Sequence, residues 1–392
     1  MPDLTDMQLS LLAHEDVAGV ALYPMPMGFR LEGAVDTDAL AAAFGHVVSR
    51  HAALSATYDF ADGTACPVPP ERLPTLADRT GAGARAEFSR VWHDGFDLER
   101  EVPVRGAFAR SGGAVDLALG IHHVAGDTWS WDLVLRDLGR AYNTMIGGKP
   151  LPAGRPPSPF EVEPTAPAVR ADVEWWRETL AGSARTPTDG GASRAYRYEV
   201  ELDARHTVAV RGTAAAAGVS LAAVLAAAVS RLAEPEASTS TVGLATALRD
   251  TPLRRQVVGP LLTILPVVTR WRPSMGAHDV VRHHAEAIGR SLEHREVPYS
   301  EIIRAAPGTG FPFEHVVNVV GDPLRLTLRG ARATEIPVFP RWAVWPVLWD
   351  FSVPAVGNIR GTLTTSEAYR GAVAQDLAKA LPAALLDFAR AS

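Results

Sequence analysis

The chain has 392 residues, of which 47 % are hydrophobic, and a formal net charge of −6 at pH 7. This length exceeds the usual limit of one hydrophobic core, so two lobes or domains are expected. The negative charge argues against nucleic acid as the main partner, because phosphate binding needs clustered Lys and Arg. Cys66 is the one cysteine. It excludes an intrachain disulfide and fits a reducing cytoplasm.

The first half of the chain alternates between strand and helix patterns. Residues 1–16 lack the basic start and apolar stretch of a signal peptide, and residues 20–34 indicate a strand. The helix that follows carries one apolar face, made by Leu40, Phe44, Val47 and Val48. Residues 56–120 mix short strands with loops, one of which contains Cys66. The Pro-rich segment 149–167 predicts a linker between two halves.

The second half of the chain repeats the order of the first half, a strand followed by a helix. Residues 196–203 alternate like a strand. Within the alanine-rich stretch 213–233, Leu221, Val224, Leu225 and Val229 recur at helical spacing behind Ser220, which predicts an internal helix with Ser220 as its cap. That stretch lacks the Leu, Ile and Phe density of a membrane span. The phrases VVSRHA and AVSRLA close the first helix of each half, which hints at a duplicated lobe. A later helix carries His283 and His284, which we expect at the surface.

The stretch IHHVAGDTWSW, residues 121–131, predicts a strand, a turn and a helix. In a regular strand His122 and His123 point to opposite sides, so they cannot both face one small site. With no Cys, His and carboxylate cluster at ligand spacing elsewhere, no metal is expected. Gly126 permits a tight turn, and Asp127 or Thr128 can cap the helix. The helix is amphipathic through Trp131, Val134, Leu135, Leu138, Tyr142 and Met145.

Two interpretations of this motif stand side by side. An imidazole at a strand end, with a carboxylate four residues on, can act as a general base, since its ordinary pKa lies near neutrality. The alternative is a pair of structural histidines, with Asp127 capping the helix or pairing with an arginine to fix the turn. The spacing alone leaves both open.

These residues and their surroundings resemble the condensation domains of nonribosomal peptide synthetases, members of the chloramphenicol-acetyltransferase-like superfamily. The family signature is HHxxxDG with a serine two residues later. The matching residues here are His122, His123, Asp127 and Ser130, and Thr128 stands at the position of the signature glycine. Further segments match in order along the chain. They are LTDMQLSLL with Gln8, RHAALSATY, the stretch ATALRD to PVVTR with Arg249, Gly259, Leu265, Pro266 and Arg270, HREVPYSEII, and WDFSV.

The resemblance implies an α/β (α+β) fold of two acetyltransferase-like lobes, which form a V-shaped pseudo-dimer with a central tunnel. Residues 1–165 would form the N-terminal lobe with the HHxxxD motif, and residues 166–392 the C-terminal lobe. Carrier proteins would deliver the donor thioester and the acceptor from opposite faces, each on a 4′-phosphopantetheine arm. The chain itself would bind no cofactor.

The implied function is condensation in nonribosomal peptide and antibiotic biosynthesis. A freestanding enzyme acting in trans would join a carrier-bound acyl thioester to an amine, with small-molecule acceptors among its partners. His123 would project into the tunnel and take or hydrogen-bond the amine proton. Asp127 would orient the turn through an arginine, and His122 would be structural. Ser130 and the backbone after Gly126 would hold the motif or an oxyanion.

The chain departs from the family at two positions. Ser55 stands where the family has an arginine proposed to pair with the motif aspartate, so Arg50 or Arg249 substitutes or the partner is missing. Thr128 replaces a glycine and is expected to narrow the channel. Three alternatives stay open. They are an ester-forming O-acyltransferase that shares His123, a non-catalytic recruitment (X-like) domain, and an epimerization-type domain, which also tends to carry Ser-Trp after the motif.

Overall fold

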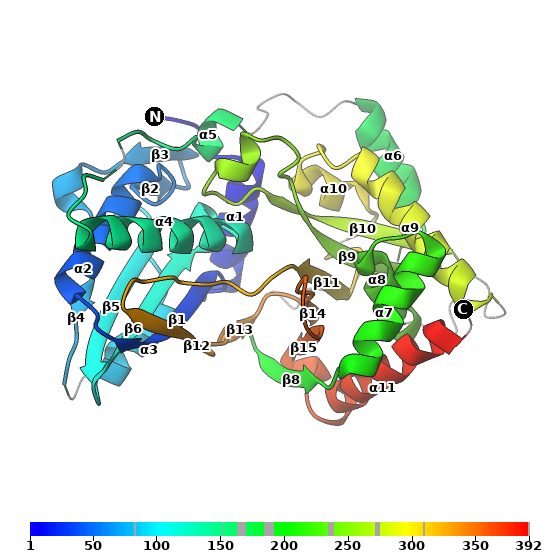
Figure 1. Cartoon of the computed structure of the whole chain (residues 1–392). Helices are drawn as coiled ribbons and strands as arrows, with labels where there is room; N and C mark the ends of the chain where they lie inside the picture. The colour runs from blue at the N-terminus through cyan, green and yellow to red at the C-terminus, as the bar shows by residue number, and fades with distance from the viewer. Residues whose placement is uncertain are drawn as a thin grey trace. The chain divides into compact units, whose positions relative to one another are not determined.

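The computed structural model describes residues 1–81, 84–151, 153–162, 170–183, 192–233, 239–270, 275–308 and 310–390 (Figure 1). The chain forms two compact units, and each draws on separate stretches of sequence. Unit 1 comprises residues 1–165, 248–262 and 324–341, and unit 2 comprises residues 166–247, 263–323 and 342–392. Two segments from the second half of the sequence therefore belong to unit 1.

The elements of unit 1 come mainly from residues 1–165, with η3 and β12 added from the second half of the sequence. They are α1 (Asp6–Ala18), β1 (Pro24–Gly33), α2 (Thr37–Arg50), β2 (Ala56–Asp59), β3 (Thr64–Pro67), η1 (Pro70–Arg72), β4 (Ala77–Asp78), α3 (Ala84–His93), β5 (Val104–Ser111), β6 (Ala114–His122), η2 (His123–Ala125), α4 (Thr128–Ile146), α5 (Pro159–Val162), η3 (Arg254–Gln256) and β12 (Ala331–Ile336). The predicted strand at residues 20–34, the helix that follows it and the helix that follows the motif are confirmed as β1, α2 and α4.

A five-stranded sheet in the order β12-β1-β6-β5-β4 forms the middle of unit 1. Helices α2 and α4 pack against each other, while α3 contacts β1, β5 and β6 (Figure 1). The two faces of β6 follow the alternation of its residues. Leu117 and Ile121 join the large core that includes α2 and α4, whereas Ala118 packs in a smaller cluster with Phe88 and Val91 of α3. The period-two pattern therefore predicted the faces of β6 correctly.

Residues 324–330 run along α4 and feed β12 into the edge of the sheet (Figure 1). Gly139 has no side chain at the crossing point, and a Cβ there would lie 2.7 Å from the carbonyl oxygen of Thr327. Asn143 fixes the same segment from α4. Its Nδ2 donates to the Thr327 carbonyl at 3.1 Å, and its Oδ1 accepts from the backbone N–H of Arg329 at 2.6 Å.

Unit 2 has its own set of elements. They are α6 (Arg170–Leu180), β7 (Ser193–Arg194), β8 (Tyr196–Val200), α7 (Ala204–Ala217), α8 (Leu221–Ala233), β9 (Thr239–Ala247), β10 (Leu262–Arg270), α9 (Ala277–Glu293), α10 (Tyr299–Ala305), β11 (His315–Val320), β13 (Trp342–Ala343), β14 (Val347–Ser352), β15 (Arg360–Thr365), η4 (Glu367–Tyr369) and α11 (Ala372–Arg390). The predicted strand at residues 196–203 is confirmed as β8.

The second sheet has six strands in the order β10-β9-β11-β14-β15-β8. Strand β11 runs parallel to β9 and β14, and the β14–β15–β8 pairs are antiparallel. Helix α8 packs on β9 and β11, and α11 packs on β8 and β15. Residues 223–230 of α8 are all buried, as expected for an internal helix.

The internal helix predicted behind Ser220 within the stretch 213–233 is confirmed as α8. The stretch contains the end of α7 and all of α8, because Gly218 adopts a left-handed conformation (φ 66°) that ends α7. Ser220 then accepts a hydrogen bond from the Ala223 N–H at the start of α8. Within the described ranges no single helix is long and apolar enough to cross a membrane; α7 and α8 reach that length only as a pair bent by 108°.

Two expectations differ from the structure. His284 is fully buried rather than at the surface, with Nδ1 2.9 Å from the Val280 carbonyl, while His283 is exposed as predicted. Burial lowers the pKa of His284 to about 4. Cys66 lies on β3 instead of in a loop, with Sγ 3.0 Å from Met1 Sδ. Residues 163–167 of the predicted linker lie outside the described residues, and its described part contains α5.

The close approach at Gly139 predicts opposite effects for two glycine substitutions. Gly139→Ala forces a methyl group against the backbone of Thr327 and is expected to destabilise unit 1 by about 1–3 kcal/mol, which corresponds to a fall of several degrees in the melting temperature. Gly212→Ala is the matched control, because this exposed residue of α7 has nothing within 4 Å of a Cβ. Its better helix propensity should raise stability by about 0.5–1 kcal/mol. Calorimetry measures both, and equal melting temperatures would contradict the prediction.

Candidate active site

The sequence IHHVAGDTWSW forms a strand end, a short turn and a helix start, all within unit 1. Strand β6 ends at His122, and His123 begins the one-turn helix η2. Asp127 then caps α4, accepting the Ser130 N–H at 2.7 Å. The two neighbouring histidines therefore belong to different elements and have different surroundings.

Both ring nitrogens of His122 bind protein groups. Nδ1 accepts from the Val124 N–H at 3.1 Å, and Nε2 lies 2.7 Å from Oε2 of Glu15 on α1. Because a backbone N–H can only donate, Nδ1 is unprotonated and the ring proton sits on Nε2, facing Glu15. The side chain is fully buried. This arrangement favours a structural role for His122.

His123 has no such pair of partners. Its backbone N–H donates to the Tyr23 carbonyl at 2.9 Å, and its ring meets the Tyr23 ring edge-on, with centroids 6.0 Å apart. The residue is partly buried, and Nδ1 is enclosed without a hydrogen-bond partner among the described residues. Burial lowers the pKa of His123, although the Asp127 charge opposes the shift. The lowered pKa favours the neutral imidazole near pH 7.

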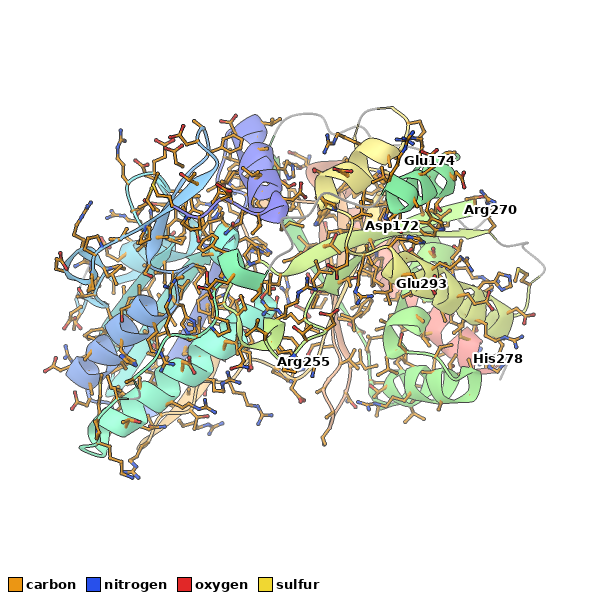
Figure 2. The ribbon with its side chains drawn as sticks, turned by 90° about the horizontal axis from the view of Figure 1, so that it is seen from above. Asp172, Glu174, Arg255, Arg270, His278 and Glu293 are labelled. Carbon is orange, nitrogen blue, oxygen red and sulfur yellow. The ribbon has the colours of Figure 1, made fainter. Side chains whose placement is uncertain are left out.

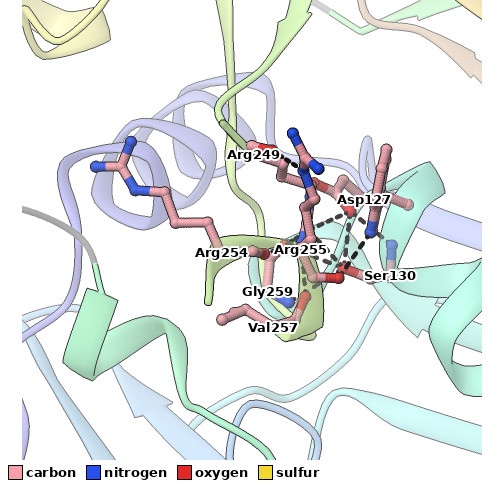
Figure 3. A network of polar contacts seen from close by, with 8 residues as sticks. Asp127, Ser130, Arg249, Arg254, Arg255, Val257 and Gly259 are labelled. Atoms are coloured by element: carbon pink, nitrogen blue, oxygen red, sulfur yellow. Dashed lines mark hydrogen bonds and ion pairs between the residues drawn. The ribbon is translucent and has the colours of Figure 1, made fainter. Parts of the chain in front are cut away.

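Arg249 is the arginine that pairs with Asp127 (Figure 3). Its Nη2 lies 2.8 Å from both Oδ1 and Oδ2, and the two side chains are only 1 % and 8 % exposed. Of the two candidates that the sequence offered, Arg249 makes this contact. The Ser55 hydroxyl donates instead to the His51 carbonyl at 3.1 Å. The aspartate therefore keeps a buried guanidinium partner although Ser55 replaces the usual arginine.

Backbone carbonyls accept further protons from the two Nη groups of Arg249, whereas its buried Nε has no hydrogen-bond partner among the described residues (Figure 3). Nη1 donates to the carbonyls of Arg254 and Val257 at 2.9 and 2.7 Å, and Nη2 also donates to Gly259 at 2.9 Å. Such additional bonds are what makes a buried ion pair tolerable, since both charges lose their water. The network fixes residues 249–259 against the start of α4.

Ser130 connects the same two segments. Its Oγ lies 2.7 Å from Asp127 Oδ1 and 3.0 Å from the Gly259 carbonyl, and it accepts from the Gly259 N–H at 3.1 Å. The side chain is fully buried. Of the two roles expected for Ser130, these contacts favour holding the motif over contacting an oxyanion.

The constraint on Gly126 is its close approach to the Ser130 side chain, because its backbone dihedral angles are ordinary. Its φ and ψ are −176° and 177°, an extended conformation open to any residue, so the tight-turn explanation is wrong. A Cβ on Gly126 would lie 3.0 Å from Ser130 Cβ. Thr128 is the exposed first residue of α4, and its predicted effect on a channel stays a prediction.

Three further residues support the motif from the N-terminal segment. The fully buried Gln8 donates from Nε2 to the Val124 carbonyl at 2.9 Å, inside η2. Tyr23 and Glu15 contact the two histidines as described above. The sequence pattern included Gln8 as a motif match without a role, and it contained no signal for Tyr23 or Glu15. Burial raises the pKa of Tyr23, so its phenol stays neutral 2.7 Å from His14 Nδ1.

Ionisable groups in unit 2 form pairs. On α6, Asp172 (Figure 2) lies 2.7 Å from His294 Nδ1, and His206 lies 2.7 Å from Asp203 at the start of α7. Across the parts of both units that the structure describes, no three His, Cys, Asp or Glu side chains are placed to hold a metal ion.

Comparison with known proteins places this geometry in a family. Residues 1–319 match the family described as Condensation domain. The chain belongs to the condensation-domain family of nonribosomal peptide synthetases. It is 28 % identical over 341 residues to N-(5-amino-5-carboxypentanoyl)-L-cysteinyl-D-valine synthase of Amycolatopsis lactamdurans, covering 81 % of this chain and 9 % of that protein. A probable non-canonical nonribosomal peptide synthetase of Salinispora arenicola is 35 % identical over 175 residues, or 43 % of this chain and 2 % of that one.

Solved structures share the fold of this condensation domain. The X-domain from teicoplanin biosynthesis superposes with a TM-score of 0.83 at 21 % identity, covering 99 % of this chain and 95 % of that chain. The first condensation domain of the calcium-dependent antibiotic synthetase, in complex with a substrate analogue, gives 0.81 at 19 % identity, with coverage of 100 % and 96 %. At these identities the likeness concerns the fold alone. The mixed helix and sheet class is thereby confirmed.

The buried Arg249–Asp127 pair yields a prediction for a double-mutant cycle. Each single change, Arg249→Ala or Asp127→Ala, leaves one buried charge without its partner and should destabilise unit 1 by about 3–5 kcal/mol. The double variant should lose less than the sum of the two, with a coupling energy of about 1–3 kcal/mol. Urea unfolding followed by tryptophan fluorescence measures all three variants.

The control for this cycle is the partly exposed pair Arg30–Asp116 on β1 and β6 of the same unit. These side chains are 41 % and 22 % exposed, so their coupling should stay below about 1 kcal/mol. Equal coupling energies in the two pairs would contradict the claim that the buried Arg249–Asp127 contact stabilises unit 1 more than the exposed pair does.

Proposed function

We propose that this domain is an acyltransferase that joins a carrier-bound acyl thioester to an amine, with His123 as the base. The observation that carries the proposal is the environment of His123. Burial lowers the pKa of its imidazole, which favours the neutral form. The residue begins a turn that the Arg249–Asp127 pair holds in place. A neutral imidazole can accept a proton near neutral pH, whereas an imidazolium cannot.

The reaction balances with this one group. The amine nitrogen attacks the thioester carbonyl, so that a C–N bond forms and the C–S bond breaks. His123 Nε2 takes the proton that the amine loses and passes it to the departing thiolate of the phosphopantetheine arm. Holding the two substrates together supplies much of the acceleration, and a positioned base adds about 10²–10⁴-fold. Asp127 acts as a positioning residue, because its carboxylate is engaged by Arg249 and Ser130.

The recruitment alternative rested on two departures from the family, Ser55 and Thr128. The contact between Arg249 and Asp127 supplies the guanidinium that Ser55 cannot, which removes one of these two reasons. The ester-forming alternative uses His123 in the same way, with an alcohol in place of the amine. Analysis of the products distinguishes the ester from the amide.

Replacement of His123 tests the proposal. With an acyl group loaded on a carrier protein and a set of candidate amines and alcohols, His123→Gln should lower the rate of coupling by about 10²–10⁴-fold. The glutamine fills a similar space, so the melting temperature should stay close to that of the native protein. Mass spectrometry of the products measures the coupling.

Coupling at the native rate in His123→Gln would contradict the role of His123 as base. The absence of coupling in the native protein, together with tight binding of an oxygenase, would favour recruitment instead. His122→Gln is the comparison at the neighbouring ring, whose loss should lower stability because both of its nitrogens bind protein groups.

The pH dependence follows from the direction of the His123 pKa. Because burial lowers it below 6.5, the base stays neutral through pH 7, and activity should fall only as pH drops through the lowered pKa. The measurement is kcat/KM between about pH 5 and 8, with a weakly basic amine that stays neutral over this range, so that the enzyme group alone titrates. A midpoint above 6.5 on the acid side would contradict the prediction.

A further inference from the structure

The solvent-exposed face of α4 carries two arginines and one aspartate. The exposed residues of this helix include Trp129, Asp132, Arg136 and Arg140, spaced by three and four residues. Residues at this spacing share one side of a helix. Asp137, between the two arginines, turns inward, and its side chain is 17 % exposed and 3.2 Å from His51 Nε2.

The segment that runs along α4 adds two more arginines. Thr327 meets Gly139 and Asn143 of α4, and the exposed Arg325 and Arg329 lie two residues on either side of Thr327. The Arg329 N–H is itself bound to Asn143. We call Arg136, Arg140, Arg325 and Arg329 the arginine face. All four belong to unit 1.

Two carboxylates of α4, Asp132 and Asp137, oppose the four arginines of the arginine face. Arg140 lies 3.9 Å from the inward-turned Asp137, and for the other three no ion pair occurs within the described parts of the chain. Asp132 is the exposed acid on this side of α4. The whole chain carries a net charge of −6, so this concentration of cations runs against its overall charge. A surface of this kind attracts an acidic partner that the rest of the molecule repels.

The arginine face also lies close to the motif. Helix α4 begins directly after Asp127, and at 1.5 Å per residue Arg136 and Arg140 are about 14 and 20 Å from Asp127 along its axis. Trp129, which is 42 % exposed, lies between them and the motif, with its indole N–H bound to the Arg255 carbonyl at 3.1 Å. A folded partner on this face would stand near the catalytic turn without covering it.

We propose that the arginine face is a docking surface for an acidic carrier protein that delivers one of the two substrates. The inference rests on the proposed function, because it names the surface through which that reaction receives its substrate. Electrostatic complementarity mainly raises the association rate, and this effect weakens as salt screens the charges. Docking at this face should therefore appear in the KM for the carrier and in its dependence on salt.

The test reverses charge on the arginine face. The variant Arg136→Glu/Arg140→Glu/Arg329→Glu should raise the KM for the carrier-bound substrate about tenfold or more and leave kcat near the native value. The same acyl group on free pantetheine should react at an unchanged rate. The matched control is Arg290→Glu/Arg304→Glu, which reverses two exposed arginines on α9 and α10 of unit 2 and should leave both KM values unchanged.

Direct binding separates this proposal from the proposed function. Fluorescence anisotropy of a labelled carrier protein, at about 50 and 500 mM salt, needs no coupling reaction. Native protein should bind the carrier more weakly at high salt, and the triple variant should lose most of the binding at low salt. Binding that is unchanged by the triple variant would overturn the docking surface, whereas absence of coupling with normal binding would overturn only the proposed reaction.

Discussion

The buried contact between Arg249 and Asp127 organises the region of unit 1 that carries the HHxxxD motif. A charge of either sign is costly to bury alone, and the pair is tolerated because the guanidinium and the carboxylate satisfy each other within 2.8 Å. The carbonyls of Arg254, Val257 and Gly259 accept the remaining Nη protons. This requirement forces residues 248–262, which come from the second half of the sequence, to pack beside the start of α4.

The position of the turn follows from that constraint. Asp127 uses one oxygen both for Arg249 and for capping α4, so the carboxylate fixes the helix start and the loop together. Gln8 holds the turn from its other side through the Val124 carbonyl. The two histidines then divide their roles, because the nitrogens of His122 are used within the protein while His123 keeps a neutral ring with Nε2 available.

Local periodicity was sufficient to predict the elements around the motif. The apolar spacing of α2 and α4 and the alternation of β6 depend only on neighbouring residues, so each could be predicted from the sequence. The choice between Arg50 and Arg249 as partner of Asp127 could not, since the contact spans 122 positions of the chain and depends on how the second half enters unit 1. The entry of residues 324–341 into the first sheet is non-local in the same way.

Two single-residue errors have equally physical causes. Gly126 has an extended backbone, and its tight feature is the proximity of Ser130, a contact that a turn signal does not encode. His284 looked like a surface residue because its helix is rich in charges, but its ring lies on the buried side near Thr269. Packing decides these features, and it involves residues distant in the chain.

The central claim is that the fold keeps the His123 imidazole neutral at the turn fixed by Arg249 and Asp127. The most direct test is an NMR titration of the protein labelled at histidine Cε1, with the His123 signal assigned by its loss in His123→Gln. This measurement needs no donor or acceptor. We predict a pKa for His123 below the ordinary value of 6.5. A pKa above 6.5, which would mean an imidazolium stabilised by Asp127, would contradict the account.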